Sequence, residues 1–306
     1  MRKYHRSRRL PIRLIAVSLA VPVVAVLAAA CGSSGNNTSN VAVAPPKSVN
    51  SIAAQVPASI KSKGSLTVAT DAEYAPNEFI AADGHTVVGM DADLAKALGQ
   101  VMGLRVNLVN ATFDTIIPGI ASGKYDLSAS SFTDTKAREH TVTFVTYFMA
   151  GTSFYVKTSG GPNIRSLADL CGHKVTMEKG TTQQADAQAQ SKKCTSAGKP
   201  AVSLQIFNDQ NAVNLALSSG RAEVAMADSP VAAYQVKQSN GTFKLSGKSY
   251  GTAPYGIVMA KNSGLEKPVL AAMKALMANG TYAKILKKWG LQPGAITNPV
   301  INGATS

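Results

Sequence analysis

The sequence predicts an α/β protein. Beyond Leu66, short runs of β-branched residues alternate with stretches whose apolar residues recur at helical spacing, a pattern typical of α/β folds. The chain has 306 residues, which is enough for about two domains, and 45% of them are hydrophobic. A chain of this composition can bury an ordinary core, so disorder throughout is excluded.

The first elements of the folded body are a strand, a helix and a second strand. Residues 66–70 and 105–109 are expected as strands because they are rich in valine, leucine and threonine. Residues 91–102 are expected as a helix with one apolar face, which Gly103 ends.

The alternation continues to the last helices of the chain. A helix is expected at 113–121, the pattern resumes at 174–177, 202–207, 212–217 and 223–227, and two helices divided at Asn279-Gly280 span 265–289. After Gly290 the chain is rich in proline, glycine and asparagine, so residues 291–306 are expected to wrap loosely.

The N-terminus has the features of an export signal. Residues 1–13 hold six of the 31 basic residues and no acid, and residues 14–30 form an apolar run that ends in small residues before Cys31. The segment 27–31 (LAAAC) resembles a bacterial lipobox, although Ala28 departs from the usual leucine. The resemblance implies cleavage before Cys31, whose thiol would carry lipid and anchor the exported protein to the outer face of the cytoplasmic membrane.

Two questions about this segment stay open. The run of 17 residues is just long enough to be a transmembrane anchor. The twin arginines Arg8 and Arg9 do not decide between the twin-arginine route and the Sec route. Residues 31–61 contain mainly serine, asparagine, alanine and proline, so they are expected to form a flexible tether.

The charge and the cysteines exclude several classes of protein. Beyond residue 30 the net charge is +8, with lysines scattered along the chain, which argues against nucleic-acid binding. Four histidines leave little for a metal site, and no glycine-rich phosphate loop is present, so no cofactor is expected. Cys171 and Cys194 are expected to pair because export leads to an oxidising compartment; two free buried thiols are the alternative.

Eight segments carry a family resemblance, and two positions depart from it. The chain resembles the family 3 extracellular solute-binding proteins of ABC importers over residues 62–290, but Asn77 and Met90 stand where that family usually has phenylalanine. The segments, in chain order, are 70–76 (TDAEYAP), 88–95 (VGMDADLA), 113–118 (FDTIIP), 130–138 (SSFTDTKAR), 166–170 (SLADL), 180–183 (GTTQ), 227–231 (ADSPV) and 280–285 (GTYAKI).

The resemblance implies the two-lobed periplasmic-binding-protein type II fold with two hinge crossings, near 148–153 and 250–255. Lobe one would combine residues 62–149 with 255–290, and lobe two would be 150–254. The implied function is to capture a polar amino acid as a monomer and deliver it to an ABC importer. The acidic residues Asp71, Glu73 and Asp91 favour a polar or cationic ligand.

An amino acid is a zwitterion, so its site needs a cation for the carboxylate and an anion for the ammonium. Arg138 suits the carboxylate, because a guanidinium donates two parallel hydrogen bonds, and it matches the family's carboxylate-binding arginine. Asp228 ends an apolar strand, where an unpaired carboxylate is costly, and it matches the family's ammonium-binding aspartate; an N-cap is the alternative role.

The other candidates surround these two charges. Thr182 would grip the carboxylate at a helix start or simply cap that helix, and Asp91 is expected to cap the helix at 91–102. The remaining candidates are Ser130, Ser131 and Thr133 for hydrogen bonds to the zwitterion, Tyr74 and Phe113 as an aromatic sandwich, and Asp71 for a polar side chain.

An enzyme on the same fold, such as an exported cyclohexadienyl dehydratase, is the main alternative. It would require a general acid beside the substrate, and none of His85, His140 and His173 falls in a pocket motif. A receptor domain is the second alternative, but no spanning segment follows the folded body. The sequence therefore predicts a binding protein and not an enzyme.

Overall fold

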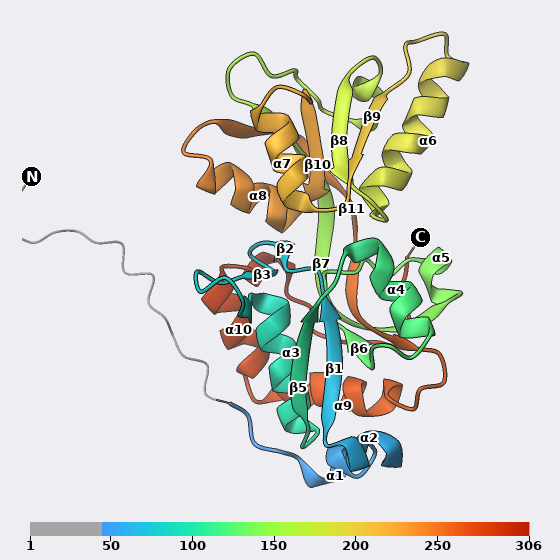
Figure 1. The fold of residues 1–306 in the computed structure, drawn as a ribbon, viewed down its shortest axis with the longest axis vertical. Coiled ribbons are helices and arrows are strands. Elements are labelled where there is room, and N and C mark those ends of the chain that lie inside the picture. The colour runs from blue at the N-terminus through green and yellow to red at the C-terminus, as the bar shows by residue number, and fades with distance from the viewer. Residues whose placement is uncertain (1–44, 306) are drawn as a thin grey trace, which may run out of the picture. The chain divides into compact units, whose positions relative to one another are not determined.

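The computed structural model describes residues 45–305. The predicted signal peptide, the lipidation site Cys31 and residues 31–44 of the predicted tether lie outside the described residues. The described chain belongs to a unit of residues 40–306, which Figure 1 shows as two lobes joined by two long strands.

One mixed sheet runs through both lobes in the order β5-β1-β6-β11-β7-β10-β8-β9. Its strands are β1 (Ser65–Thr70), β5 (Arg105–Asn110), β6 (Leu127–Ser128), β7 (Val142–Lys157), β8 (Lys174–Glu178), β9 (Ser203–Phe207), β10 (Val224–Asp228) and β11 (Phe243–Ala260). A small antiparallel sheet is formed by β2 (Glu73–Tyr74), β3 (Glu78–Ile80) and β4 (Val87–Val88).

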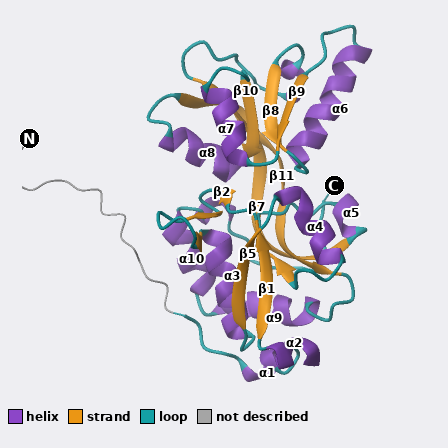
Figure 2. Ribbon diagram, in the orientation of Figure 1, coloured by secondary structure: helices purple, strands orange, loops and turns teal. Residues whose placement is uncertain are grey.

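Helices cover the outside of the sheet in each lobe (Figure 2). Lobe one carries α1 (Asn50–Ala53), α2 (Ala58–Lys63), α3 (Met90–Val101), α4 (Phe113–Ala121), α5 (Lys136–Glu139), α9 (Glu266–Ala278) and α10 (Thr281–Trp289), followed by the 3-10 helix η2 (Gln292–Gly294). Lobe two carries the 3-10 helix η1 (Leu167–Leu170), α6 (Thr182–Ser196), α7 (Gln210–Ser218) and α8 (Ser229–Gln238).

Strands β7 and β11 belong to both lobes. They pair antiparallel from Val142↔Ala260 in lobe one to Lys157↔Phe243 in lobe two, and the register is irregular only between Ser246 and Gly256. That irregular stretch includes the predicted crossing at 250–255. The predicted α/β fold of two lobes with two crossing strands is therefore confirmed.

Each lobe has a core of its own. Leu94, Leu98 and Val101, which share one face of α3, are no more than 1% exposed and pack against β1, α9 and α10. In lobe two, Val175 and Met177 of β8 are fully buried. Burying one such side chain contributes about 1.5–3 kcal/mol, so each lobe is stabilised independently of the cleft between them.

The end of the predicted tether differs from the expected flexible segment. Residues 45–61 contain α1 and most of α2, and Ile52 and Val56 are only 7% and 2% exposed against the core of lobe one. These two apolar side chains contribute enough burial to order a segment whose overall composition is polar.

The C-terminal tail is also more ordered than expected. Thr146 and Val300 exchange two hydrogen bonds of 2.9 Å, and Asn302 N donates to Phe144 O at 3.0 Å, so the tail lies along β7. At its end, Gly303 N donates to the Asp134 carboxylate at 2.7 Å. Proline and glycine limit regular structure in this segment, but backbone hydrogen bonds to β7 hold it in place.

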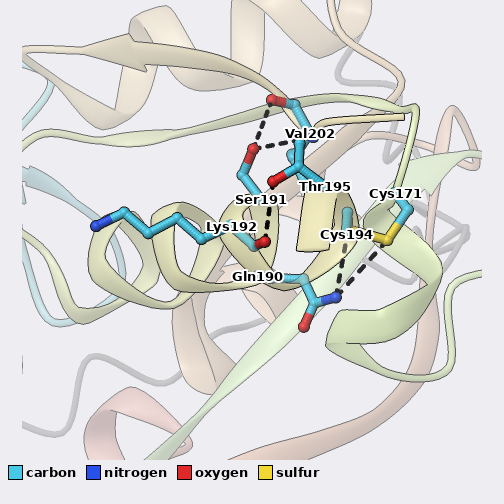
Figure 3. Close-up of a disulfide and its surroundings, with 7 residues drawn as sticks. All are labelled: Cys171, Gln190, Ser191, Lys192, Cys194, Thr195 and Val202. Atoms are coloured by element: carbon cyan, nitrogen blue, oxygen red, sulfur yellow. Dashed lines mark hydrogen bonds between the residues drawn. A yellow bond between two sulfur atoms is a disulfide. The ribbon is translucent and has the colours of Figure 1, made fainter. Parts of the chain in front are cut away.

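The predicted Cys171–Cys194 disulfide is present, with 5.7 Å between the two Cα atoms. Figure 3 shows it joining the end of η1 to α6, with the Gln190 Nε2 atom 3.4 Å from the Cys194 sulfur. Within residues 45–305, no helix is both long and apolar enough to cross a membrane.

We expect replacement of both Cys171 and Cys194 by serine to lower the free energy of unfolding of lobe two. The bridge closes a loop of 23 residues, and the chain-entropy model assigns such a loop about 3 kcal/mol. Urea unfolding of the oxidised protein, the reduced protein and the double variant measures this loss. Equal stability of all three would contradict the expectation.

Candidate ligand-binding site

A narrow polar cavity lies between the two lobes. Its walls come largely from the carboxyl ends of parallel strands: Asp71 follows β1, Glu178 ends β8 and Asp228 ends β10. In open α/β sheets this edge is where ligands bind, since polar side chains and free N–H groups gather there. The residues lining the cavity are Asp71, Tyr74, Glu78, Phe113, Ser131, Thr133, Arg138, Glu178, Thr181, Thr182, Gln183 and Asp228.

The fold brings almost all predicted ligand-binding residues to this cavity. Only Ser130 lies outside the lining; its hydroxyl accepts a 2.8 Å hydrogen bond from Asp71 N and donates to Glu78 at 3.3 Å. The predicted residues that do line the cavity are Asp71, Tyr74, Phe113, Ser131, Thr133, Arg138, Thr182 and Asp228.

Arg138 is held at one end of the cavity by stacking and by backbone carbonyls. Its guanidinium lies 5.2 Å from the centre of the Phe132 ring, and that ring is stacked on Phe113. Nη1 donates to Thr133 O at 2.7 Å, and Nη2 donates to Gly180 O of lobe two at 2.9 Å. Burial lowers the pKa of Arg138 to about 10, so the guanidinium is charged at neutral pH.

Asp228 faces Arg138 across the cavity. Its carboxylate accepts hydrogen bonds from Tyr255 Oη at 2.6 Å and Gln183 Nε2 at 2.7 Å. Burial raises the pKa of Asp228, whereas these two donors and the Arg138 charge lower it. The carboxylate makes no side-chain cap for α8, so the alternative N-cap role is not observed.

Two roles predicted for helix starts are corrected. The side chain of Thr181, not Thr182, caps α6 by accepting from Gln184 N at 3.2 Å. Asp91 does not cap α3: it lies in the first turn, fully buried, and accepts 2.7 Å hydrogen bonds from Ser131 N and Tyr147 Oη. Asp91 therefore accepts its hydrogen bonds from residues distant in the sequence, and not from the N–H groups at the start of its own helix that an aspartate near a helix start usually binds.

A pair of buried carboxyl groups lies beneath the cavity. Glu78 is 1% exposed and Asp91 is fully buried, and the two carboxyl groups lie close enough for each to affect the pKa of the other. Burial, followed by the charge of Asp91, raises the pKa of Glu78 well above its ordinary value. Both groups hold Ser131, whose backbone adopts an unusual φ of 50°.

Two further acids, one from each lobe, line the cavity. Asp71 accepts a 2.7 Å hydrogen bond from Phe113 N, and Glu178 of lobe two lies close enough to affect its pKa. Burial raises the pKa of Asp71 to about 6. Burial, followed by the charge of Asp71, raises the pKa of Glu178 well above its ordinary value.

Four cavity-lining residues were missed from the sequence: Glu78, Glu178, Thr181 and Gln183. Glu178 could have been found, since it ends the apolar strand 174–178 just as Asp228 ends 224–228. Glu78 begins β3, the short central strand of the small sheet, and has no comparable signal in its neighbours.

The lining residues carry an excess of acid. Four are carboxyl groups, namely Asp71, Glu78, Glu178 and Asp228, whereas Arg138 is the single basic side chain among them. His85, His140 and His173 do not line the cavity, and no group of residues in 45–305 could hold a metal ion. A ligand that carries both a carboxylate and extra positive charge would best balance these groups.

The two lobes touch around the cavity. Lys179 of lobe two pairs with Asp114 of α4 at 2.8 Å, and Asn211 Nδ2 donates to Glu73 at 3.2 Å. Across the same contact, Asp228 N of lobe two donates a 3.0 Å hydrogen bond to Tyr74 Oη of lobe one. Two α/β lobes on paired crossing strands, closed over a polar cavity, define a solute-binding protein.

The family of this protein follows from a comparison of its sequence with family models. The model of bacterial extracellular solute-binding proteins, family 3, matches residues 66–292. The chain belongs to this family, as the resemblance predicted.

Individual relatives are similar over most of their length. The arginine-binding protein ArgT of Corynebacterium glutamicum is 28% identical over 97% of this chain and 98% of its own. The solved structure of an ancestral arginine-binding protein bound to arginine is 36% identical, with a TM-score of 0.68 over 74% of this chain and 98% of its own. The solved structure of the ancestral amino acid-binding protein AncCDT-1, a precursor of cyclohexadienyl dehydratase, is 32% identical, with a TM-score of 0.68 over 76% of this chain and 97% of its own.

We expect Arg138→Ala to fold and to lose amino-acid binding. Removing one partner of a desolvated charge pair costs about 2–5 kcal/mol, which is roughly a 30- to several-thousand-fold loss of affinity. A thermal-shift panel of amino acids, followed by calorimetry, measures the loss. Arg105→Ala is the control, since Arg105 is an exposed arginine at the start of β5 in the same lobe. Near wild-type affinity of Arg138→Ala would contradict its role.

Proposed function

We propose that the protein captures a cationic amino acid, L-arginine above all, outside the cell and delivers it as a monomer to an ABC importer. The observation that carries the proposal is the charge of the cavity, where four carboxyl groups face a single guanidinium. Burial favours the protonated forms of Glu78 and Glu178, and a second positive charge on the ligand would favour the ionised carboxylates, whereas a neutral amino acid would not.

Each part of arginine has a complementary group. Arg138 would bind the α-carboxylate through parallel hydrogen bonds, with Thr133 and Thr182 beside it, and Asp228 would bind the α-ammonium. Tyr74 and Phe113 would enclose the aliphatic stem. At the far end, Asp71 would accept hydrogen bonds from the distal guanidinium.

Two of the relatives support the same ligand. Both ArgT of Corynebacterium glutamicum and the ancestral protein of the solved structure are arginine-binding proteins, and ArgT aligns over 97% of this chain.

We expect the affinity for arginine to fall as the pH falls. Burial raises the pKa of Asp71 to about 6, and burial together with Asp209 raises the pKa of Glu73 to about 7. A bound cation favours the ionised carboxylates, so binding must release these protons at low pH. With one proton of pKa about 6 to displace, Kd should rise about 10-fold between pH 7.5 and pH 5.

The stability of the ligand-free protein should change in the opposite direction. Burial raises the pKa of Asp71 from 3.8 to about 6 in the folded state. The contribution of Asp71 to the free energy of unfolding is therefore fully present below pH 3.8 and is lost as the pH rises through 6. The rise in Tm that arginine causes should therefore be larger at pH 7.5 than at pH 5. Calorimetry and thermal unfolding at both values measure the two effects, and binding that is independent of pH would contradict the proposal.

An enzyme on the same fold is the second candidate. The observation in its favour is the raised pKa of Asp71 and Glu178, because a protonated carboxyl group in a cavity can act as a general acid. The likeness to a precursor of cyclohexadienyl dehydratase points in the same direction. Assays of prephenate and arogenate turnover separate the two functions, since a binding protein converts neither.

We propose that the protein is a lipoprotein anchored through Cys31. The support is the sequence alone, namely the basic segment 1–13, the apolar run 14–30 and the small residues before the cysteine. A lipid anchor would keep the captured ligand near the importer. We expect Cys31→Ser to abolish labelling by radioactive palmitate and to prevent normal processing. Unchanged labelling of the variant would contradict the anchor.

A further inference from the structure

We propose that Glu178 is a specificity-determining residue, which supplies from lobe two a second carboxylate for the distal cation of the ligand. The cavity then closes favourably around a cationic side chain and unfavourably around a neutral one of the same shape. This inference rests on the proposed binding of a cationic amino acid and assigns its selectivity to one residue.

The position of Glu178 fits this role. The side chain ends β8, is 3% exposed and lines the cavity. Among the described residues, its Oε1 atom is buried without a hydrogen-bond partner. A buried carboxylate oxygen without a donor is costly, and a ligand that donates to it would remove that cost.

The charges that face Glu178 are almost all negative. The charges of Asp71, Glu73 and Asp209 all raise its pKa. The nearest lysine in sequence, Lys179, is paired with Asp114 at 2.8 Å. Arg138, the single basic side chain of the lining, donates to Thr133 O and Gly180 O.

A guanidinium satisfies both cavity carboxylates at once. It carries five N–H donors in a planar fork and can donate to two carboxylates in the same plane. In its absence, burial and the charge of Asp71 favour the protonated form of Glu178. The urea group of citrulline has nearly the same shape but no charge, so it cannot replace that proton.

Because Asp71 comes from lobe one and Glu178 from lobe two, the pair forms only when the lobes close. Bringing two carboxylates together is unfavourable unless a proton or a cation lies between them. A cationic ligand removes this repulsion and so favours the closed form, whereas a neutral ligand does not. The preference for a cationic over a neutral ligand therefore depends on the Asp71–Glu178 pair, which joins the two lobes.

The test compares arginine with citrulline on the wild-type protein and on Glu178→Gln. Calorimetry at pH 7.5 should give the wild type a strong preference for arginine. In the variant, the ratio of the two affinities should fall about 10- to 100-fold, mainly through weaker arginine binding, since a hydrogen bond to a charged group has been replaced by a neutral one.

A stability measurement and a control variant separate selectivity from damage to the fold. Without ligand, Glu178→Gln should have a Tm equal to or above that of the wild type, because the amide removes repulsion from Asp71. Glu223→Gln alters a glutamate at the opposite end of the same lobe, beside His173, and should leave the affinity ratio unchanged.

The outcomes distinguish the two proposals. If the wild type binds no cationic amino acid, the proposed function fails. If the wild type prefers arginine and Glu178→Gln keeps the same affinity ratio, the proposed function stands and the role of Glu178 is overturned.

Discussion

The antiparallel pairing of β7 and β11 is the constraint on which the rest of the structure depends. Each strand supplies one part to lobe one and another to lobe two, so the sheet is continuous while the two cores remain separate. The pairing of the two strands is irregular only between Ser246 and Gly256, which is the segment between the lobes. Lobe motion about that segment would leave both cores intact, which is the property that a capture mechanism needs.

The buried carboxyl groups show how binding function opposes stability. Glu78, Asp91 and Glu178 are each no more than 3% exposed, and burial raises the pKa of all three. A core built for stability alone would not retain them. The same raised pKa values that prepare the cavity for a cation also resemble those of a general acid, which gives a physical reason why binding proteins and dehydratases can share one fold.

Part of the site could be predicted from single positions, because its chemistry is local. Arg138 lies in a segment with a family pattern, and Asp228 ends an apolar strand, so both could be named before any contact was known. Gln183 and Thr181 could not, since a polar residue in the first turn of a helix is ordinarily a cap or a solvent contact. Asp91 was assigned to a cap for the same reason, and Tyr147, which is 56 residues away, overrides that local preference.

The sequence by itself determined the order of strands and helices and the polar residues at strand ends, because these follow from local periodicity and spacing. It also favoured the pairing of Cys171 and Cys194, because the predicted export leads to an oxidising compartment. Only the tertiary structure decided which carboxyl groups meet. Asp71 and Glu178 are more than 100 residues apart in the sequence, and each is unremarkable until closure of the lobes brings them into contact. The tail at 295–304 and the helices at 50–63 were likewise decided by tertiary contacts, because polar segments become ordered only when a core offers them hydrogen bonds and apolar surface.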